Sequence, residues 1–116
     1  MLQEAWLKTG VHITSIGYNP PGSELGRELA ESGYLFVESR RAFEPMPSGS
    51  AELQSLDPQV GTELGEVLLG VRPGRTTSNQ RTIYKSMGHA MQDSVAANLV
   101  YRLAQQRGLG KKIDLI

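Results

Sequence analysis

Two short segments of the chain have the residue types that surround small-molecule sites in open α/β sheets. Residues 16–23, Ile-Gly-Tyr-Asn-Pro-Pro-Gly-Ser, follow a β-branched run, and residues 82–93 lead from another strand-like run through Ser86 into a long helical pattern. Ligands of such sheets bind beyond the carboxyl ends of the strands, where loops meet helix N-termini. Both segments are therefore candidate sites, although a plain strand-to-helix connection would also produce the pattern of residues 16–23.

Four further side chains could take part in chemistry, and each has a structural alternative. His12 could be a ligand or a core or edge histidine, and His89 could be a general acid or base or a solvated residue in a first helical turn. Arg72 and Arg75 could clamp a phosphate or lie on the surface. With no cysteine and two histidines, we expect neither a disulfide nor a metal site. The motif G-x-G-x-x-G, the P-loop and G-x-S-x-G are all absent from the sequence.

The elements that would position these residues alternate between two- and 3.6-residue periods, which predicts an α/β fold. Strands are expected over 11–16, 34–37 and 81–85. Helices are expected over 2–8, 24–32, 58–69 and 87–107. Ser23, Asp57 and Ser86 are the expected N-caps of the last three helices. Gly61 and Gly65 lie inside the third helix pattern and indicate close approach of another backbone or of a ligand.

Size and charge narrow the class of protein. A chain of 116 residues suits one small domain or a piece of a larger one. Residues 1–59 hold four Lys/Arg and eight Asp/Glu, and residues 60–116 hold the reverse, so the charge changes from −4 to +4. The basic half could face an anionic cofactor phosphate, or the charges could simply be scattered over the surface. Seven aromatic residues and no dense Lys/Arg stripe argue against nucleic-acid binding.

Two further absences in the sequence bear on location. The sequence has no 18-residue apolar run, so we expect no membrane span. The first residues do not resemble a secretory signal, so a cytoplasmic location is expected.

Three ordered motifs resemble the ornithine cyclodeaminase/mu-crystallin family. They are Trp6-Leu-Lys-Thr-Gly-Val-His-Ile-Thr-Ser-Ile-Gly17 followed by Glu24-Leu25, Glu63-Leu-Gly-Glu-Val-Leu-Leu-Gly70 followed by Pro73-Gly-Arg-Thr76, and Lys85-Ser-Met-Gly-His-Ala-Met-Gln-Asp93. The family combines a Rossmann NAD(P)-binding domain with a dimerisation domain built from the N-terminal half and the C-terminal helix. This chain resembles its C-terminal third. The resemblance implies that residues 1–85 are the C-terminal half of a partial Rossmann-type domain, and that residues 86–116 are the C-terminal helix and tail returning toward the dimerisation domain.

The resemblance also assigns roles to individual residues. The family's cofactor-contacting loop falls on Ile16, Gly17, Tyr18 and Asn19. Ser86 matches a serine that contacts the nicotinamide end of the cofactor, and Met87 matches its substrate-side neighbour. Asn19 stands where cyclodeaminases have a catalytic aspartate, and an amide has no proton that titrates near neutrality. The resemblance therefore favours ketimine reductases over ornithine cyclodeaminases.

For function, the resemblance implies an NAD(P)-dependent oxidoreductase that reduces a cyclic ketimine or acts on an amino acid. The expected cofactor is NAD or NADP, and the expected partner is a second copy in a homodimer. This piece alone would bind the cofactor weakly or not at all, because the family's phosphate-binding glycine motif lies upstream. The alternative is a non-enzymatic remnant that binds a nucleotide or another ligand, or that only dimerises.

Overall fold

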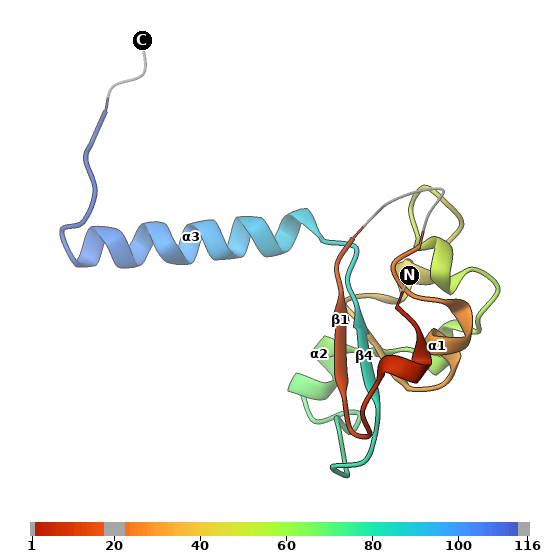
Figure 1. Cartoon of the computed structure of the whole chain (residues 1–116). Coiled ribbons are helices and arrows are strands. Elements are labelled where there is room, and N and C mark those ends of the chain that lie inside the picture. The colour runs from red at the N-terminus through yellow and green to blue at the C-terminus, as the bar shows by residue number, and fades with distance from the viewer. Residues whose placement is uncertain (1, 18–22, 114–116) are drawn as a thin grey trace.

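Parallel strands form the centre of the fold in the computed structural model, which describes residues 2–17 and 23–113. The strands in this part of the chain are β1 (His12–Ser15), β2 (Tyr34–Val37), β3 (Thr62–Glu63) and β4 (Thr82–Lys85). They form one sheet in the order β1-β4-β2-β3, so the last of the described strands lies between the first two. Figure 1 shows β1 and β4 side by side. The predicted strands are present, β2 with its expected bounds, and the prediction of an α/β fold is confirmed.

Two short helices and one long helix accompany the sheet. They are α1 (Arg27–Glu31), α2 (Leu64–Leu68) and α3 (Ala90–Gln106). Single 3₁₀ turns lie at Glu4–Trp6, Arg40–Phe43, Ala51–Leu53 and Pro58–Val60. Helix α1 packs on one face of the sheet, whereas α3 projects away from the body of the molecule (Figure 1). None of the helices in the described ranges has the length and apolar character needed to cross a lipid bilayer.

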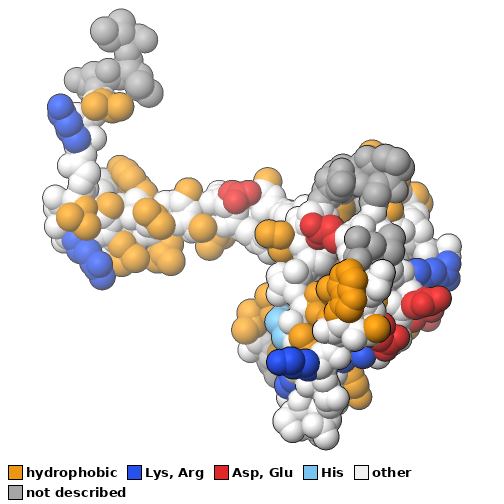
Figure 2. Space-filling model, in the orientation of Figure 1, with side chains coloured by type: hydrophobic (Ala, Val, Ile, Leu, Met, Phe, Trp, Pro, Cys, Tyr) orange, Lys and Arg blue, Asp and Glu red, His pale blue; other side chains and the backbone are white. Residues whose placement is uncertain are grey.

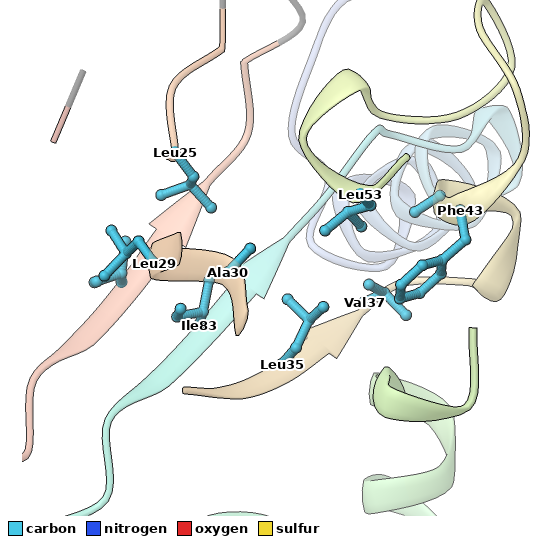
Figure 3. Close-up of a cluster of buried hydrophobic side chains, with 10 residues drawn as sticks. Leu25, Leu29, Ala30, Leu35, Val37, Phe43, Leu53 and Ile83 are labelled. Carbon is cyan, nitrogen blue, oxygen red and sulfur yellow. The ribbon is translucent and has the colours of Figure 1, made fainter. Parts of the chain in front are cut away.

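The core lies on the α1 face of the sheet. Alternate strand residues point to this face, and the cluster includes Leu35, Val37 and Ile83, which are almost fully buried. Figure 3 shows these side chains directed toward Leu29 of α1 and toward Leu53. Burying each such aliphatic side chain contributes about 1.5–3 kcal/mol, so this face supplies most of the fold's apolar stabilisation.

The predicted helix over 58–69 is wrong. Asp57 is an N-cap, with its Oδ1 accepting from the backbone N–H of Gln59 at 2.9 Å, but it caps only the 3₁₀ turn Pro58–Val60. Gly61 is extended there, and a Cβ on it would lie 2.7 Å from the ring of Phe43. The next two residues pair with β2 as β3, so only Leu64–Leu68 remain helical. At Gly61 the close neighbour is the Phe43 side chain and not the backbone or ligand that was expected, and no described atom lies within 4 Å of a Cβ built on Gly65.

The other predicted helices are also shorter in the structure than expected. The predicted helix over 2–8 is a 3₁₀ turn, and the helix over 24–32 begins only at Arg27, with Gly26 and not Ser23 as its N-cap. The reason is that this segment pairs with the N-terminal residues: Leu25 forms a parallel bridge with Leu2, and the Leu2 backbone N–H donates to the Glu24 carbonyl. Ser86 is likewise not the cap of α3.

His89 caps α3 instead. Its Nδ1 accepts from the backbone N–H of Met91 at 3.1 Å. The backbone N–H of Ser86 donates to the carbonyl of Ser15, which continues the pairing of β1 and β4 by one step and delays the helix. A solvated residue in a first helical turn was one of the two interpretations of His89, and its capping role fits that interpretation.

Helix α3 contains no buried residue. Its exposed large apolar residues are Met91, Val95, Leu99, Val100, Tyr101 and Leu103. Figure 2 shows such side chains distributed along the projecting helix. A helix with this many apolar residues normally packs against other structure.

Candidate site at the carboxyl edge of the sheet

Both predicted site segments leave the same edge of the sheet. Ser15 at the end of β1 is in register with Lys85 at the end of β4, and Lys85 with Val37 of β2. Because the strands are parallel, Ile16 and Gly17 emerge beside Ser86 and Met87. Ile16 is 73% exposed, which is unusual for an isoleucine that directly follows a core strand. Tyr18 and Asn19 lie outside the described residues.

Glu38, the first residue after β2, anchors the start of the segment that follows β4. Its Oε2 accepts a short hydrogen bond from the Ser86 hydroxyl, and its Oε1 accepts from the backbone N–H of Met87 at 2.6 Å. The orientation of Ser86 is therefore set by a carboxylate from the neighbouring strand. Glu38 was not among the residues predicted for the site, because a single acidic residue after a strand carries no local signal.

Lys85 is the most deeply buried charged residue of this edge, with 1% of its side chain exposed. Its ammonium group donates to Gly17 O at 2.8 Å, Ser15 Oγ at 2.9 Å and Glu52 Oε2 at 2.9 Å. Lysine has three donor protons, and each has an oxygen partner here. Lys85 lies within the predicted site segment 82–93, but its sequence position gives no sign of these three partners.

Two carboxylates complete this network. Glu24 Oε2 accepts from the Ser15 hydroxyl at 2.6 Å and from the backbone N–H of Gly17 at 2.8 Å. These two hydrogen bonds lower the pKa of Glu24. Burial disfavours the charged form of Glu52, but hydrogen bonds from Ser50, Lys85 and two backbone N–H groups outweigh it and lower the pKa of this carboxyl as well.

A small cavity of about 150 Å³ opens beside Met87. It is lined by Glu38, Ser39, Arg41, Ala42, Ser48, Met87, Gly88 and His89. Its walls therefore combine a carboxylate, a guanidinium, two hydroxyls and an imidazole close to the residues that leave β4. Such a lining suits a small polar molecule, and Arg41 is its partner for an acidic group.

His12 and Arg75 lie far from this edge, at the amino ends of β1 and β4. His12 Nδ1 is 2.7 Å from Thr82 Oγ1, and the Arg75 guanidinium donates to Gly10 O at 2.6 Å and to Thr82 Oγ1 at 2.9 Å. Arg75 thus joins the two strands, and its donors are used in the fold rather than left for a phosphate. Arg72 donates to Gln59 O at 3.3 Å.

Away from the carboxyl edge, the described residues form no metal-binding cluster and one apolar cavity lies on the other face of the sheet. The described ranges contain no group of three or more His, Asp or Glu side chains placed to hold a metal ion. An apolar cavity of about 340 Å³ lies on the face of the sheet opposite the core, between the strands and the Leu64 and Val67 side chains of α2.

Comparison with known proteins gives a consistent result. The sequence profile of the ornithine cyclodeaminase/mu-crystallin family matches residues 1–108. The ketimine reductase mu-crystallin of Mus musculus is 40% identical over 97 residues, which cover 83% of this chain and 29% of that protein. A Δ1-pyrroline-2-carboxylate reductase of Bacillus cereus is 30% identical over 118 residues, covering 93% of this chain and 35% of that protein.

Solved structures show the same similarity. The Thermococcus litoralis Δ1-pyrroline-2-carboxylate reductase, solved in complex with NADH and L-proline, superimposes with a TM-score of 0.75 at 29% identity. The match covers 94% of this chain and 35% of that one. A probable ornithine cyclodeaminase from Bordetella pertussis Tohama I gives a TM-score of 0.67 at 31% identity, covering 91% of this chain and 36% of that one. The chain thus spans about a third of the length of the relatives that it matches.

Proposed function

Because this chain belongs to the ornithine cyclodeaminase/mu-crystallin family, we propose that it forms the C-terminal third of an NAD(P)-dependent oxidoreductase that reduces a cyclic ketimine, a small cyclic imine bearing a carboxylate. The observation that carries the proposal is the pairing of β1 with β4, which brings exposed Ile16 and anchored Ser86 to one carboxyl edge. The proposal includes a homodimer in the cytoplasm.

The residues of this edge fit the nicotinamide end of the cofactor. Ile16 offers an exposed apolar side chain of the kind that packs on a flat ring, and Ser86 beside it offers a hydroxyl. NADH or NADPH would supply the hydride, and the protein would supply orientation. The part of the cofactor that carries its phosphates would be held by the upstream segment, which has the glycine-rich loop in this family.

Substrate recognition is assigned to the cavity beside Met87. Arg41 and Ser48 in its wall could receive a carboxylate, and Met87 would pack on the ring of the imine. Asn19 belongs to the site by resemblance alone. Its amide could hold a substrate or cofactor group by hydrogen bonds, but it does not accept a proton as the aspartate of cyclodeaminases does.

The experiment uses the longer protein that would carry this chain as its C-terminal third. Its coding sequence upstream of Met1 should contain an in-frame G-x-G-x-x-[GAS] segment after a strand pattern. Purified with that segment, the protein should oxidise NADH or NADPH with pyrroline-2-carboxylate or piperideine-2-carboxylate and should not deaminate ornithine. Asn19→Asp should change at least one of these activities, because it adds a charge beside the nicotinamide.

The isolated 116-residue chain is the control, and it should show no saturable NADH binding at micromolar concentration by nicotinamide fluorescence. The absence of an upstream glycine-rich segment, together with no activity on either imine, would favour the alternative function, a non-enzymatic binding or dimerising module. Asn19→Asp with unchanged kinetics on all substrates would remove Asn19 from the proposed site.

A further inference from the structure

We infer that Lys85, Glu24 and Glu52 form a positioning network that fixes both peptide groups of Gly17, and that Lys85 and Glu24 are positioning residues for the reaction. The inference rests on the proposed function, because it concerns the orientation of Ile16 and Gly17 toward the cofactor. None of these three charged residues lines the cavity beside Met87. They act through the backbone at the end of β1.

Charged side chains bind both the carbonyl and the N–H of Gly17. Its carbonyl accepts from Lys85 Nζ at 2.8 Å, and its N–H donates to Glu24 Oε2 at 2.8 Å. An ammonium and a carboxylate thus bind the acceptor and the donor of one residue, and charged partners make stronger hydrogen bonds than neutral ones. The peptide planes on both sides of Gly17 are therefore fixed relative to β4.

The Glu24 carboxylate leaves no room for a side chain at residue 17. A Cβ built on residue 17 would lie 2.0 Å from Glu24 Oε1 and 2.3 Å from its carboxyl carbon. The φ angle of Gly17 is not positive, so the backbone conformation alone does not require a glycine at this position. The glycine is instead required for the carboxylate to reach the backbone.

Glu52 binds the backbone that follows residues 18–22. Glu52 Oε1 accepts from the backbone N–H of Glu24 at 2.6 Å and of Leu25 at 3.2 Å, while its Oε2 pairs with Lys85. The same ammonium therefore connects the backbone before residues 18–22 to the backbone after them. One buried cation organises both.

The charges of Lys85 and Glu52 do more than fill space in the core. A buried ion pair adds little stability over an apolar pair of the same size, because removing the charges from water opposes their attraction. Methionine could fill the space of Lys85 in the core without any carboxylate partner. What the charges add is direction, since they hold particular peptide groups where Ile16 and Ser86 meet.

The structural test uses the 116-residue chain, with amide exchange of Gly17 measured by NMR and global stability by thermal unfolding. Glu24→Ala removes the acceptor of the Gly17 N–H but leaves the buried pair of Lys85 and Glu52. Lys85→Met combined with Glu52→Gln neutralises that pair without leaving a lone buried charge. In both variants the Gly17 amide should exchange at least about tenfold faster than in the wild type, while the Ile83 amide in β4 changes less than about twofold.

Arg81→Met is the matched control. Arg81 precedes the same strand at its other end, where it pairs with Glu4 at 2.7 Å. Its loss should leave Gly17 exchange unchanged. Gly17 protection that persists in Glu24→Ala, or that falls equally in Arg81→Met, would overturn the inference. Glu24 is 43% exposed, so its variant remains informative if the doubly substituted chain fails to fold.

The functional test places Glu24→Ala in the longer protein. It should lower kcat at least about tenfold and change KM for the imine less than about twofold, because orientation is lost and substrate contacts are kept. An unchanged kcat with accelerated Gly17 exchange would contradict the positioning role. Accelerated exchange in a protein that reduces no imine in any form would instead contradict the proposed function and leave the network itself established.

Discussion

Lys85 and Glu52 show how residue chemistry at the carboxyl edge depends on partners far away in sequence. Their side chains are 1% and 4% exposed, so neither charge is solvated by water. Lys85 instead donates to the Ser15 hydroxyl of β1, and Glu52 accepts from the Ser50 hydroxyl and from the backbone N–H of Glu24. Removing one partner would leave the other as an uncompensated buried charge, which costs far more than the pair contributes.

The first residue-scale prediction concerns acid stability. The pKa values of Glu24 and Glu52 lie below the ordinary value of 4.5 in the folded chain, so the unfolded chain binds more protons in acid. The two carboxylates contribute their full stabilisation above pH 4.5. This contribution is lost as the pH falls through their lowered pKa values in the folded chain. The free energy of unfolding, measured by urea titration at a series of pH values, should therefore decrease when the pH is lowered below 4.5.

Glu52→Gln is the control for this pH dependence. The variant should be less stable at neutral pH, and its stability should fall less steeply with acid, because one of the titrating carboxylates is gone. Curves that run parallel for the two proteins would show that Glu52 does not contribute to the acid dependence.

At this scale the sequence predicted part of the site. The two-residue period of β4 places Lys85 on the same face as Ile83, so its burial could have been predicted from the strand alone. Its partners could not, because Glu52 lies in a 3₁₀ turn with no periodic pattern, and Glu24 and Glu38 resemble ordinary surface acids. Strand-end signals and the family resemblance pointed to Ile16, Gly17, Ser86 and Met87. The structure brings these four residues to one edge of the sheet, and their roles toward a cofactor or substrate stay predictions.

At the scale of elements, the region between Asp57 and Gly70 shows tertiary contacts overriding periodicity. Leu64, Val67 and Leu68 do lie on a helix, and Glu63 and Glu66 cap it with reciprocal hydrogen bonds. Upstream of Glu63, pairing of Thr62 with Phe36 of β2 replaces the helix. A spacing of apolar residues cannot reveal a competing strand partner, whereas strands such as β2 were found because their apolar runs are continuous.

The element-scale prediction compares the two glycines of this region. Gly65→Ala should stabilise the isolated chain by about 0.5–1 kcal/mol, because it removes a glycine from helix α2 and its Cβ meets no described atom. Gly61→Ala should destabilise it by about 1–3 kcal/mol, because the Cβ would lie 2.7 Å from the buried Phe43 ring. Denaturant unfolding of both variants against the wild type measures the difference, and effects of the same sign would contradict this account.

At the scale of the whole molecule, α3 and the outer edge of β1 are left without partners in the described part of the chain. β1 pairs only with β4 there, and α3 buries none of its residues. The division into a partial Rossmann-type domain over 1–85 and a returning helix and tail over 86–116 stays a prediction. Relatives about three times as long have further chain that could cover both surfaces.

The whole-molecule prediction is that the isolated chain self-associates through α3. Each ~100 Å² of apolar surface recovered is worth about 2.5 kcal/mol before the entropy costs of association. Light scattering across a hundredfold dilution should show species heavier than 12.7 kDa that dissociate on dilution. A monomer at every concentration would contradict it.

A pair of matched variants locates the interface. Leu99→Gln with Leu103→Gln on α3 should give a monomer, because both side chains belong to the exposed apolar surface of that helix. Leu68→Gln with Leu69→Gln near the end of α2 removes two apolar side chains that are even more exposed, and it should leave the association intact. The reverse pattern would place the interface on α2.

The position of β4 has a consequence for how the chain is made. A ribosome releases β1, β2 and β3 before β4. β2 can already pair with β3, whereas β1 must wait for β4, with which it pairs across 70 residues of sequence. Until residue 85 has emerged from the exit tunnel, the nascent chain holds β1 and β2 with no shared neighbour. Synthesis that pauses before that point would therefore expose an incompletely paired sheet to chaperones and proteases. The sheet would be completed only when β4 is released.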